Sequence, residues 1–356
     1  MNHRIYGIQQ IGIGTSDFRK SFQWYIDHFG FDALIFDDNT TAELMLPYTG
    51  GQPHQRHAGL AMNLQGGSGM EIWQYKDRTP LAPATPLRIG DLGINAARLR
   101  CPDIEKAYQH LLQKGLTSLQ PPSTAPNGQQ HLWVRDLAGN LFDLIEDQRQ
   151  FQNLHQPIGG ICGAMVGVSD INAARQVYSG ILGYDQVQYD QTRAFDDLSP
   201  LPGGQEPMRR VLLTRSEQAH GGFSKLFGPS AIELVQTTQR TPQRIFQGRL
   251  WGDLGLIHLC FDIKGMESLQ RTCQELGRPF TVDSNVKGRF DMGEAAGRFT
   301  YIEDPDGTLI EFVETYKVPL LKALGLNLRM EHKPMDAAVP NWIIRLLRLK
   351  RTKHAK

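Results

Sequence analysis

The chain repeats itself, because residues of its first half return in the same order in its second half. Those that recur at a distance of 153 positions are Ser16-Asp17, Tyr25, Gly30 and Phe31, matched by Ser169-Asp170, Tyr178, Gly183 and Tyr184. The distance is 162 positions for Gly90-Asp91-Leu92-Gly93 and 168 positions for Asp136, Gly139 and Leu141. Since the distance grows in steps, we interpret the chain as two copies of one domain that differ by loop insertions.

Each copy divides again into two units with the same order of elements. The first unit begins with a strand-like segment at 6–14 and continues with a helix at 17–29, which Asp17 caps and Gly30 ends. Helices are predicted at the same place in the other units, at 103–114, 170–182 and 266–276. Glycine-containing turns at 136–140 and 304–308 precede the last strand of each copy. The pattern predicts a strand, a helix and three strands, four times over.

Length and charge restrict the class of protein. At 356 residues the chain has room for two domains of about 150 residues each. Its net charge of +1 provides no overall field for nucleic acid, so we expect no nucleic-acid partner. No segment approaches the roughly 18 apolar residues of a membrane-spanning helix, and no signal peptide is visible. The four cysteines lack CxxC spacing, which favours buried, reduced thiols and a cytoplasmic location.

Two acidic residues fall in the middle of apolar strands. Asp143 lies between Phe142 and Leu144, and Glu311 lies in the same way within the last strand of the second copy. Because burying an unpaired charge is costly, such a carboxylate must face water, a charged partner or a metal.

These features resemble the vicinal oxygen chelate superfamily, which includes glyoxalase I, extradiol dioxygenases and bleomycin-resistance proteins. The segments that carry the resemblance are 11–17 (Ile-Gly-Ile-Gly-Thr-Ser-Asp), 166–170 (Val-Gly-Val-Ser-Asp) and 304–311 (Asp-Pro-Asp-Gly-Thr-Leu-Ile-Glu). The resemblance implies an α+β fold of four βαβββ modules paired into two open, cupped β-barrel domains, at 4–148 and 158–316. Residues 317–356 are expected to form a C-terminal extension.

In that superfamily two units form one cup, and four positions converge inside it. With consecutive units paired, the resemblance implies Gln10, Glu71, Ala96 and Asp143 for the first domain, and Gly163, Glu233, His258 and Glu311 for the second. In the second domain Glu233, His258 and Glu311 would bind Zn, Mn, Fe, Co or Ni, with Glu311 or Glu233 as the catalytic proton carrier. The first domain would offer a weaker, oxygen-only site of Gln10, Glu71 and Asp143, or a degenerate, substrate-binding copy.

The implied function is a metal-dependent, glyoxalase-like isomerase, epimerase or lyase that acts on a small molecule with neighbouring oxygens through an enediolate or enolate. Two alternatives stay open: a metal-free binding protein of the bleomycin-resistance type, and an Fe(II) dioxygenase. Gly163, where ring-cleaving dioxygenases have histidine, argues against the latter. Lys225 and Arg298, in glycine-containing segments of the second copy only, are candidates for binding an anionic substrate group, or are exposed loop cations.

The C-terminal extension contains a basic amphipathic helix. Trp342, Ile343, Leu346 and Leu347 are predicted on one face, with arginines elsewhere. Such a helix packs on its own protein body or on a partner subunit of a homo-oligomer; the alternative is a membrane surface.

Overall fold

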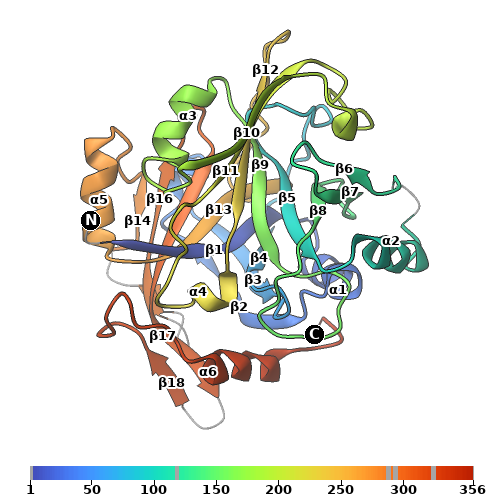
Figure 1. Cartoon of the computed structure of the whole chain (residues 1–356). Helices are drawn as coiled ribbons and strands as arrows, with labels where there is room; N and C mark the ends of the chain where they lie inside the picture. Colours follow the sequence, from blue (N-terminus) through green and yellow to red (C-terminus); the bar gives the residue numbers. More distant parts are fainter. Residues whose placement is uncertain (1–2, 117–119, 286–289, 292–295, 322–325, 356) are drawn as a thin grey trace.

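The computed structural model describes residues 3–116, 120–285, 290–291, 296–321 and 326–355. It contains the four predicted modules, which confirms the α+β class (Figure 1). The first module comprises β1 (Arg4–Gly14), α1 (Phe18–Phe29), β2 (Ala33–Ala42), β3 (His54–Met62) and β4 (Gly69–Tyr75). The second comprises β5 (Gly93–Cys101), α2 (Ile104–Gln113), β6 (Ser123–Thr124), β7 (Gln130–Arg135) and β8 (Leu141–Glu146).

The second half repeats this order. The third module comprises β9 (Ile161–Gly167), α3 (Ile171–Tyr178), β10 (Gln186–Arg193), β11 (Met208–Thr214) and β12 (Ala231–Thr237), with a short helix α4 (Ser224–Phe227) before β12. The fourth comprises β13 (Gly255–Lys264), α5 (Met266–Glu275), β14 (Val282–Asp283), β15 (Phe290–Asp291), β16 (Ala296–Glu303) and β17 (Leu309–Leu321).

Capping residues and glycines set the helix ends as predicted. The side chain of Asp17 accepts a hydrogen bond from the backbone N–H of Lys20, and Asp170 caps α3 in the same way. Gly30 ends α1 with a φ of 70°, a conformation that favours glycine. The third helix, α3, ends at Tyr178 rather than at the predicted residue 182 before Gly183. Local sequence therefore explains where both helices begin and where α1 ends.

The modules pair differently from the prediction. β1 lies antiparallel to β13, so the first and fourth modules share one ten-stranded sheet, sheet A, whose main order is β14-β16-β17-β13-β1-β4-β3-β2. β5 lies antiparallel to β9, so the second and third modules share sheet B, in the order β10-β11-β12-β9-β5-β8-β7-β6. The segments 4–148 and 158–316 each contribute one module to each sheet. The expected pairing of consecutive modules is therefore wrong.

The reason lies in the equivalence of the modules. The first strand of every module offers the same hydrogen-bonding edge, so the strand pattern alone does not select its partner. The connections at 76–92 and 238–254 cross between the sheets, whereas the connection at 147–160 stays within sheet B. Long connections such as these permit either arrangement.

One large buried cluster combines side chains of both sheets with those of α1, α2, α3 and α5. The opposite face of each sheet carries smaller clusters of its own. In sheet A these include Trp73, Trp251 and Tyr301, and in sheet B Trp133 and Phe195. The two sheets thus share one core on one side and curl around separate interiors on the other, which we call cup A and cup B.

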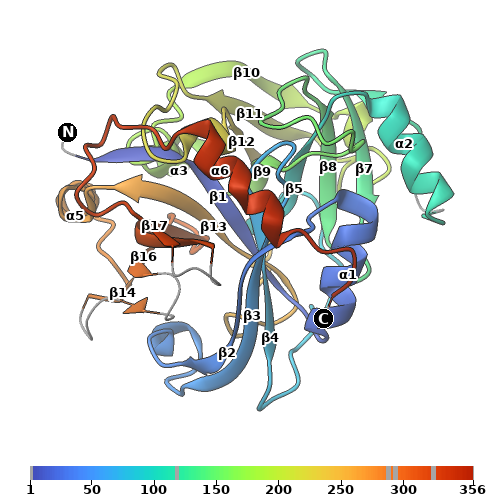
Figure 2. The ribbon, with the colours of Figure 1, turned by 90° about the horizontal axis from the view of Figure 1, so that it is seen from below.

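The C-terminal extension folds back on the first module (Figure 2). β18 (Leu326–Arg329) pairs with β17, and α6 (Asn341–Arg345) continues into a 3-10 helix at Leu346–Lys350. Ile344 and Leu347 are buried in a cluster with side chains of β1 and β3, which confirms that the helix packs on its own body. Trp342, predicted on the packed face, is 66% exposed. Trp342 lies two residues before the buried Ile344 in α6, so the two side chains point to opposite sides of the helix.

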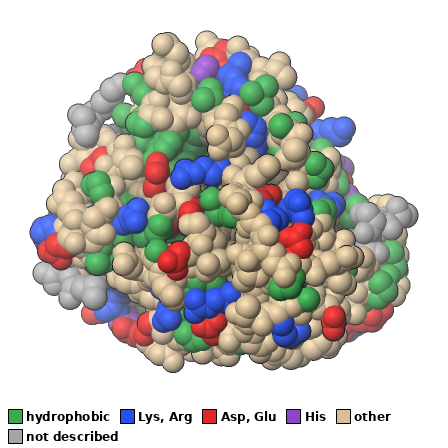
Figure 3. Space-filling view, turned by 90° about the horizontal axis from the view of Figure 1, so that it is seen from above, with side chains coloured by type: hydrophobic (Ala, Val, Ile, Leu, Met, Phe, Trp, Pro, Cys, Tyr) green, Lys and Arg blue, Asp and Glu red, His purple; other side chains and the backbone are tan. Residues whose placement is uncertain are grey.

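No helix in the described part of the chain is long and apolar enough to cross a membrane. On the face shown in Figure 3, basic and acidic side chains lie next to one another rather than in one large patch of either sign.

Candidate metal centre

Four polar side chains converge in cup A, two from each half of the chain. They are Gln10 on β1, Glu71 on β4, His258 on β13 and Glu311 on β17. The strand register brings them together, because Gly12 lies opposite both Glu71 and His258, and Cys260 lies opposite both Gln10 and Glu311. The pairing of the first and fourth modules creates a site that neither half contains alone.

The candidate ligand atoms lie within reach of one ion. Nε2 of His258 is 3.1 Å from Oε2 of Glu311 and 3.4 Å from Oε2 of Glu71. One ligand atom from each of these three side chains lies within 4.8 Å of the others. Nε2 of Gln10 is 3.4 Å from Oε2 of Glu71, and a half-turn of this amide would bring its carbonyl oxygen to the same place. We call Glu71, His258 and Glu311 the triad.

Cup A concentrates buried polar atoms that have no hydrogen-bond partner. In the part of the chain that the structure describes there are fourteen such side-chain atoms, and seven of them lie in cup A. They are Oε1 of Gln10, Nη1 of Arg56, Nε1 of Trp73, Nε1 of Trp251, both ring nitrogens of His258, and Oε2 of Glu311. Two of these atoms, Nε2 of His258 and Oε2 of Glu311, lie 3.1 Å apart and form an ion pair only when the imidazole is protonated. Because buried polar groups are normally satisfied, this concentration indicates a polar ligand or ion between them.

The imidazole of His258 is held by packing. Its ring stacks on Trp251, with centroids 6.1 Å apart, and meets Tyr301 edge-on at 5.5 Å. On β1 the neighbouring residue is Gly12, where an added Cβ would lie only 2.2 Å from Cε1 of His258. The glycine in the 11–17 motif thus makes room for the imidazole.

The two triad carboxylates repel each other in a buried site. Burial and the charge of Glu311 raise the pKa of Glu71 to about 7, although His258 and Arg56 act in the opposite direction. Burial alone would lower the pKa of His258, but the carboxylates of Glu311 and Glu71 outweigh it, and the pKa is raised. A cation between these groups would remove the repulsion and keep both carboxylates ionised.

The donor set fits a divalent metal. An imidazole nitrogen, two carboxylates and an amide oxygen suit Zn, Mn, Fe, Co or Ni and leave coordination positions open. His258 and Glu311, predicted as metal ligands, are brought together by the structure. Glu71 takes the place predicted for Glu233, and Gln10 joins the cup of His258 rather than that of Asp143.

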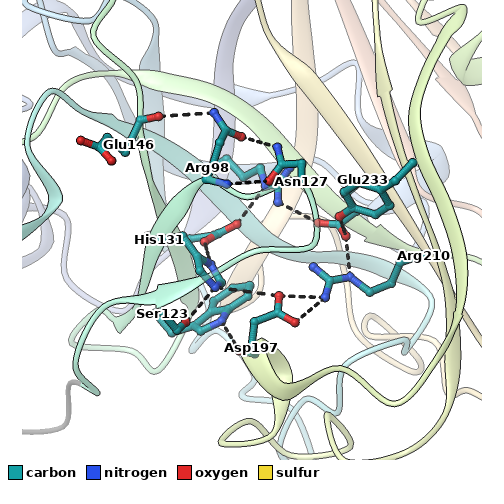
Figure 4. A network of polar contacts seen from close by, with 12 residues as sticks. Arg98, Ser123, Asn127, His131, Glu146, Asp197, Arg210 and Glu233 are labelled. Carbon is teal, nitrogen blue, oxygen red and sulfur yellow. Dashed lines mark hydrogen bonds and ion pairs between the residues drawn. The ribbon is translucent and has the colours of Figure 1, made fainter.

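Cup B contains a network of ion pairs at the equivalent positions (Figure 4). By strand register the counterparts of Gln10, Glu71, His258 and Glu311 are Gly163, Glu233, Ala96 and Asp143. The guanidinium of Arg98 donates from Nε to Asp143 at 2.9 Å and from Nη2 to Glu233 at 2.8 Å. An arginine of the chain thus bridges the two carboxylates of cup B.

Further partners surround both carboxylates. Arg210 donates from Nε to Glu233 at 2.6 Å, and Nδ1 of His131 lies 2.8 Å from Oδ1 of Asp143. Although burial opposes ionisation, His131 and Arg98 lower the pKa of Asp143 to about 2, and Arg210 and Arg98 lower the pKa of Glu233. Both carboxylates are therefore charged and neutralised by side chains.

Two predicted ligand sets are corrected by this placement. Glu233 lies in the other cup from His258, so its predicted role as metal ligand and catalyst beside His258 is wrong. Asp143 is likewise separated from Gln10 and Glu71, so the predicted oxygen-only site does not form. Both errors come from the predicted pairing of the modules. The position of each candidate residue within its own strand was predicted correctly.

The two predicted substrate-binding cations lie elsewhere. Arg298 is buried on the side of sheet A that faces α5, where it pairs with Asp283 at 2.7 Å and with Glu267 at 2.9 Å. Tyr301, three residues further along the same strand, faces the cup instead. Lys225 on α4 is exposed and lines a surface pocket with Arg149, to which no triad residue contributes. The prediction is thus wrong for Arg298, and Lys225 stands apart from the triad.

Sequence reasoning missed four basic residues that line the cups. They are Arg56, Arg98, His131 and Arg210. The same sequence pattern that identified the mid-strand acids could have identified one of them, namely a charged residue between apolar neighbours in a strand. Arg98 stands between Ala97 and Leu99. A buried base in a strand requires a partner as much as a buried acid does.

Comparison with known proteins gives one family. Residues 7–144 match the model of the Glyoxalase/Bleomycin resistance protein/Dioxygenase superfamily. A candidate dioxygenase from Bacillus subtilis subsp. subtilis str. 168 has a similar fold, with a TM-score of 0.57 and 14% identity over 87% of this chain and 86% of that one. Glyoxalase I from Zea mays has a TM-score of 0.52 and 13% identity over 88% of this chain and 92% of that one. No curated protein sequence matches the chain.

Proposed function

We propose, from the match of residues 7–144 to the Glyoxalase/Bleomycin resistance protein/Dioxygenase superfamily and from the geometry of the triad, that the chain is a metal-dependent enzyme with its active site in cup A. It would act on a small molecule with neighbouring oxygens, by isomerase, epimerase or lyase chemistry. The observation that supports this proposal is the convergence of His258, Glu71 and Glu311, in which, among the described residues, no hydrogen bond satisfies the ring nitrogens of His258 or Oε2 of Glu311.

A divalent metal bound there would act as a Lewis acid for an enediolate or enolate. His258 and Glu311 are the more buried ligands, with side-chain exposures of 1% and 8%, and would hold the ion. Glu71 is 15% exposed, so it is the carboxylate placed to take a proton from one substrate carbon and return it to the next. Trp251 and Tyr301 pack around His258 and would keep water from the reacting atoms.

The donor set favours this reaction class over dioxygenation. Non-haem iron oxygenases combine two imidazoles with one carboxylate. Cup A offers one imidazole and two carboxylates among its described residues, together with the amide of Gln10. A metal-free binding protein stays the alternative that the first experiment decides.

The metal content of protein incubated with Zn, Mn, Fe, Co or Ni and then desalted tests the site. We expect about one ion per chain in the wild type and in Glu233→Gln, and a large loss in Glu71→Gln and His258→Ala. Glu233→Gln is the matched control, because Glu233 occupies the equivalent position in cup B. Equal, near-zero content in all variants would leave only the metal-free binding protein.

Proton exchange tests the chemistry. The loaded protein is incubated in D₂O with a panel of 2-hydroxy ketones and 2-hydroxy aldehydes, and deuterium at the carbon next to the carbonyl is followed by NMR. We expect exchange of at least one compound by the wild type, and its loss in Glu71→Gln even when enough metal is added to fill the site of the variant. Metal binding without exchange of any compound would contradict the proton-transfer mechanism.

A further inference from the structure

One arginine in cup A has a free arm. Arg56 on β3 pairs through Nη2 with Asp38 on β2, at 2.8 Å. The two side chains are 14% and 18% exposed. The other terminal nitrogen of Arg56, Nη1, is buried and has no hydrogen-bond partner among the residues that the structure describes. Since a buried charged donor without a partner is costly, this nitrogen points to a missing acceptor.

Arg56 lies on the same face as the triad. In the pairing of β3 with β4, Leu60 lies opposite Glu71, Ala58 opposite Trp73, and Arg56 opposite Tyr75. Opposed residues of an antiparallel pair project to the same side, so Arg56 faces the cup, four residues or about 13 Å along the strand from the Glu71 row. The long arginine side chain shortens that gap.

The row between Arg56 and the triad carries a small residue. Ala58 occupies the position in β3 that Arg210 occupies in β11, two residues before the partner of the equivalent glutamate. In cup B the Arg210 side chain fills this place and pairs with Glu233. In cup A the smaller Ala58 is buried in a cluster with Trp73 and Trp251, and among the described residues Nε1 of Trp73 has no hydrogen-bond partner.

We propose that Arg56 binds a carboxylate of the substrate whose neighbouring oxygens lie at the triad. This rests on the proposed function and names the substrate class: a small compound with a chelating oxygen pair at one end and a carboxylate at the other. A carboxylate fits better than a phosphate dianion, because Asp38 already neutralises one charge of the pair and a single guanidinium arm is left.

Ligand binding to the Co²⁺-loaded protein tests this, with the visible Co²⁺ spectrum as readout. The probes are 2-oxoglutarate and 2-oxoadipate, and the controls are 2-oxopentanoate and 2-oxohexanoate, which lack the distal carboxylate. We expect one of the diacids to bind at least about tenfold more tightly than its control, the gain typical of a charge-assisted hydrogen bond. Arg56→Gln should lose this preference, and Arg56→Lys should keep part of it.

Arg209→Gln is the matched control, because Arg209 pairs with Asp190 across the second and third strands of the third module, β10 and β11, at 2.7 Å. It should keep the preference for the diacid. Failure to bind Co²⁺ would contradict the proposed function itself. Co²⁺ binding without a preference for either diacid, or a preference that Arg56→Gln retains, would overturn the role of Arg56 alone.

Discussion

His258 and Ala96 occupy the same position in β13 and β5, and Cys260 and Arg98 occupy the next cup-facing one. In cup A the imidazole is present and the next residue is small, so among the described residues His258 is the only ion-pair partner of the two acids. In cup B the imidazole is missing, and the guanidinium reaches both acids. These two differences, together with Arg210 at the position of Ala58, thus separate a candidate metal centre from an ion-pair network.

Replacement of Arg98 should show how much the network stabilises the fold. Arg98→Met leaves Asp143 and Glu233 buried with one basic partner fewer each, so we expect a loss of about 3–5 kcal/mol in the free energy of unfolding. Urea denaturation measures it. Arg209→Met, which removes an exposed pair, should cost less than about 1 kcal/mol. Equal losses would contradict the structural role of Arg98.

Gly12 should be essential for the orientation of His258. In Gly12→Ala the new Cβ would overlap the imidazole, so the ring must move. We expect metal affinity, measured by competition with a chelator, to fall at least about tenfold, the size of effect seen when ligand orientation is disturbed. Unchanged affinity would mean that His258 does not bind the metal in this orientation.

Asp262 should make stability depend on pH. Burial raises the pKa of Asp262 to about 8, although hydrogen bonds from Thr315 and Gln9 oppose this. Since its unfolded pKa is about 4, the folded state holds this proton more tightly, and its contribution to stability is lost as pH rises from about 4 to about 8. In urea denaturation across this range, Asp262→Asn should reduce the decline. An unchanged slope would contradict the shift.

At the scale of elements, the sequence contained most of what determines the structure. Asp17 and Gly30 mark the ends of a helix through local hydrogen bonds and backbone conformation, and the repeat transferred this to the other modules. The final strands were placed by the glycine-containing turns at 136–140 and 304–308 that precede them. These predictions depend on short-range physics, which a sequence displays directly.

The choice of partner strand could not be predicted in this way. β1 can pair with β5 or β13 through the same kind of edge, and long connections permit both. The choice of partner strand decides which acids lie beside His258. His258 and Glu311 were therefore predicted correctly as neighbours, but Glu233 was predicted in the place that Glu71 occupies. Arg210 lies on β11, opposite Val235 on β12, and its guanidinium pairs with Glu233. Had this arginine been noticed in its apolar strand, it would have indicated that the charge of Glu233 is already neutralised.

The C-terminal helix offers a test at this scale. Ile344 is 1% exposed and packs with residues of the first module, whereas Trp342 is 66% exposed. We expect Ile344→Ala to lower the free energy of unfolding by about 2–4 kcal/mol and Trp342→Ala by less than about 0.5 kcal/mol. Urea denaturation of both variants checks this. The reverse order would restore the face predicted from the sequence.

At the scale of the whole molecule, the duplicated halves are interlocked. Because each half supplies one module to each sheet, a cut between 148 and 158 separates β1 from β13 and β5 from β9. We expect fragments 1–152 and 153–356 to be unfolded or self-associated when expressed alone, and to form a 1:1 complex when expressed together. Size-exclusion chromatography with light scattering measures this. Two stable monomeric fragments would support the sequential domains instead.

Because Arg98 bridges the two carboxylates of cup B, the two cups should respond differently to the supply of metal. The positive charge in cup B belongs to a side chain of the protein, so a chelator cannot remove it. Cup A would depend on what the surroundings provide. We therefore expect removal of the metal to abolish the proposed activity without unfolding the protein, because Arg98 still neutralises the carboxylates of cup B. The activity should return when the metal is added back.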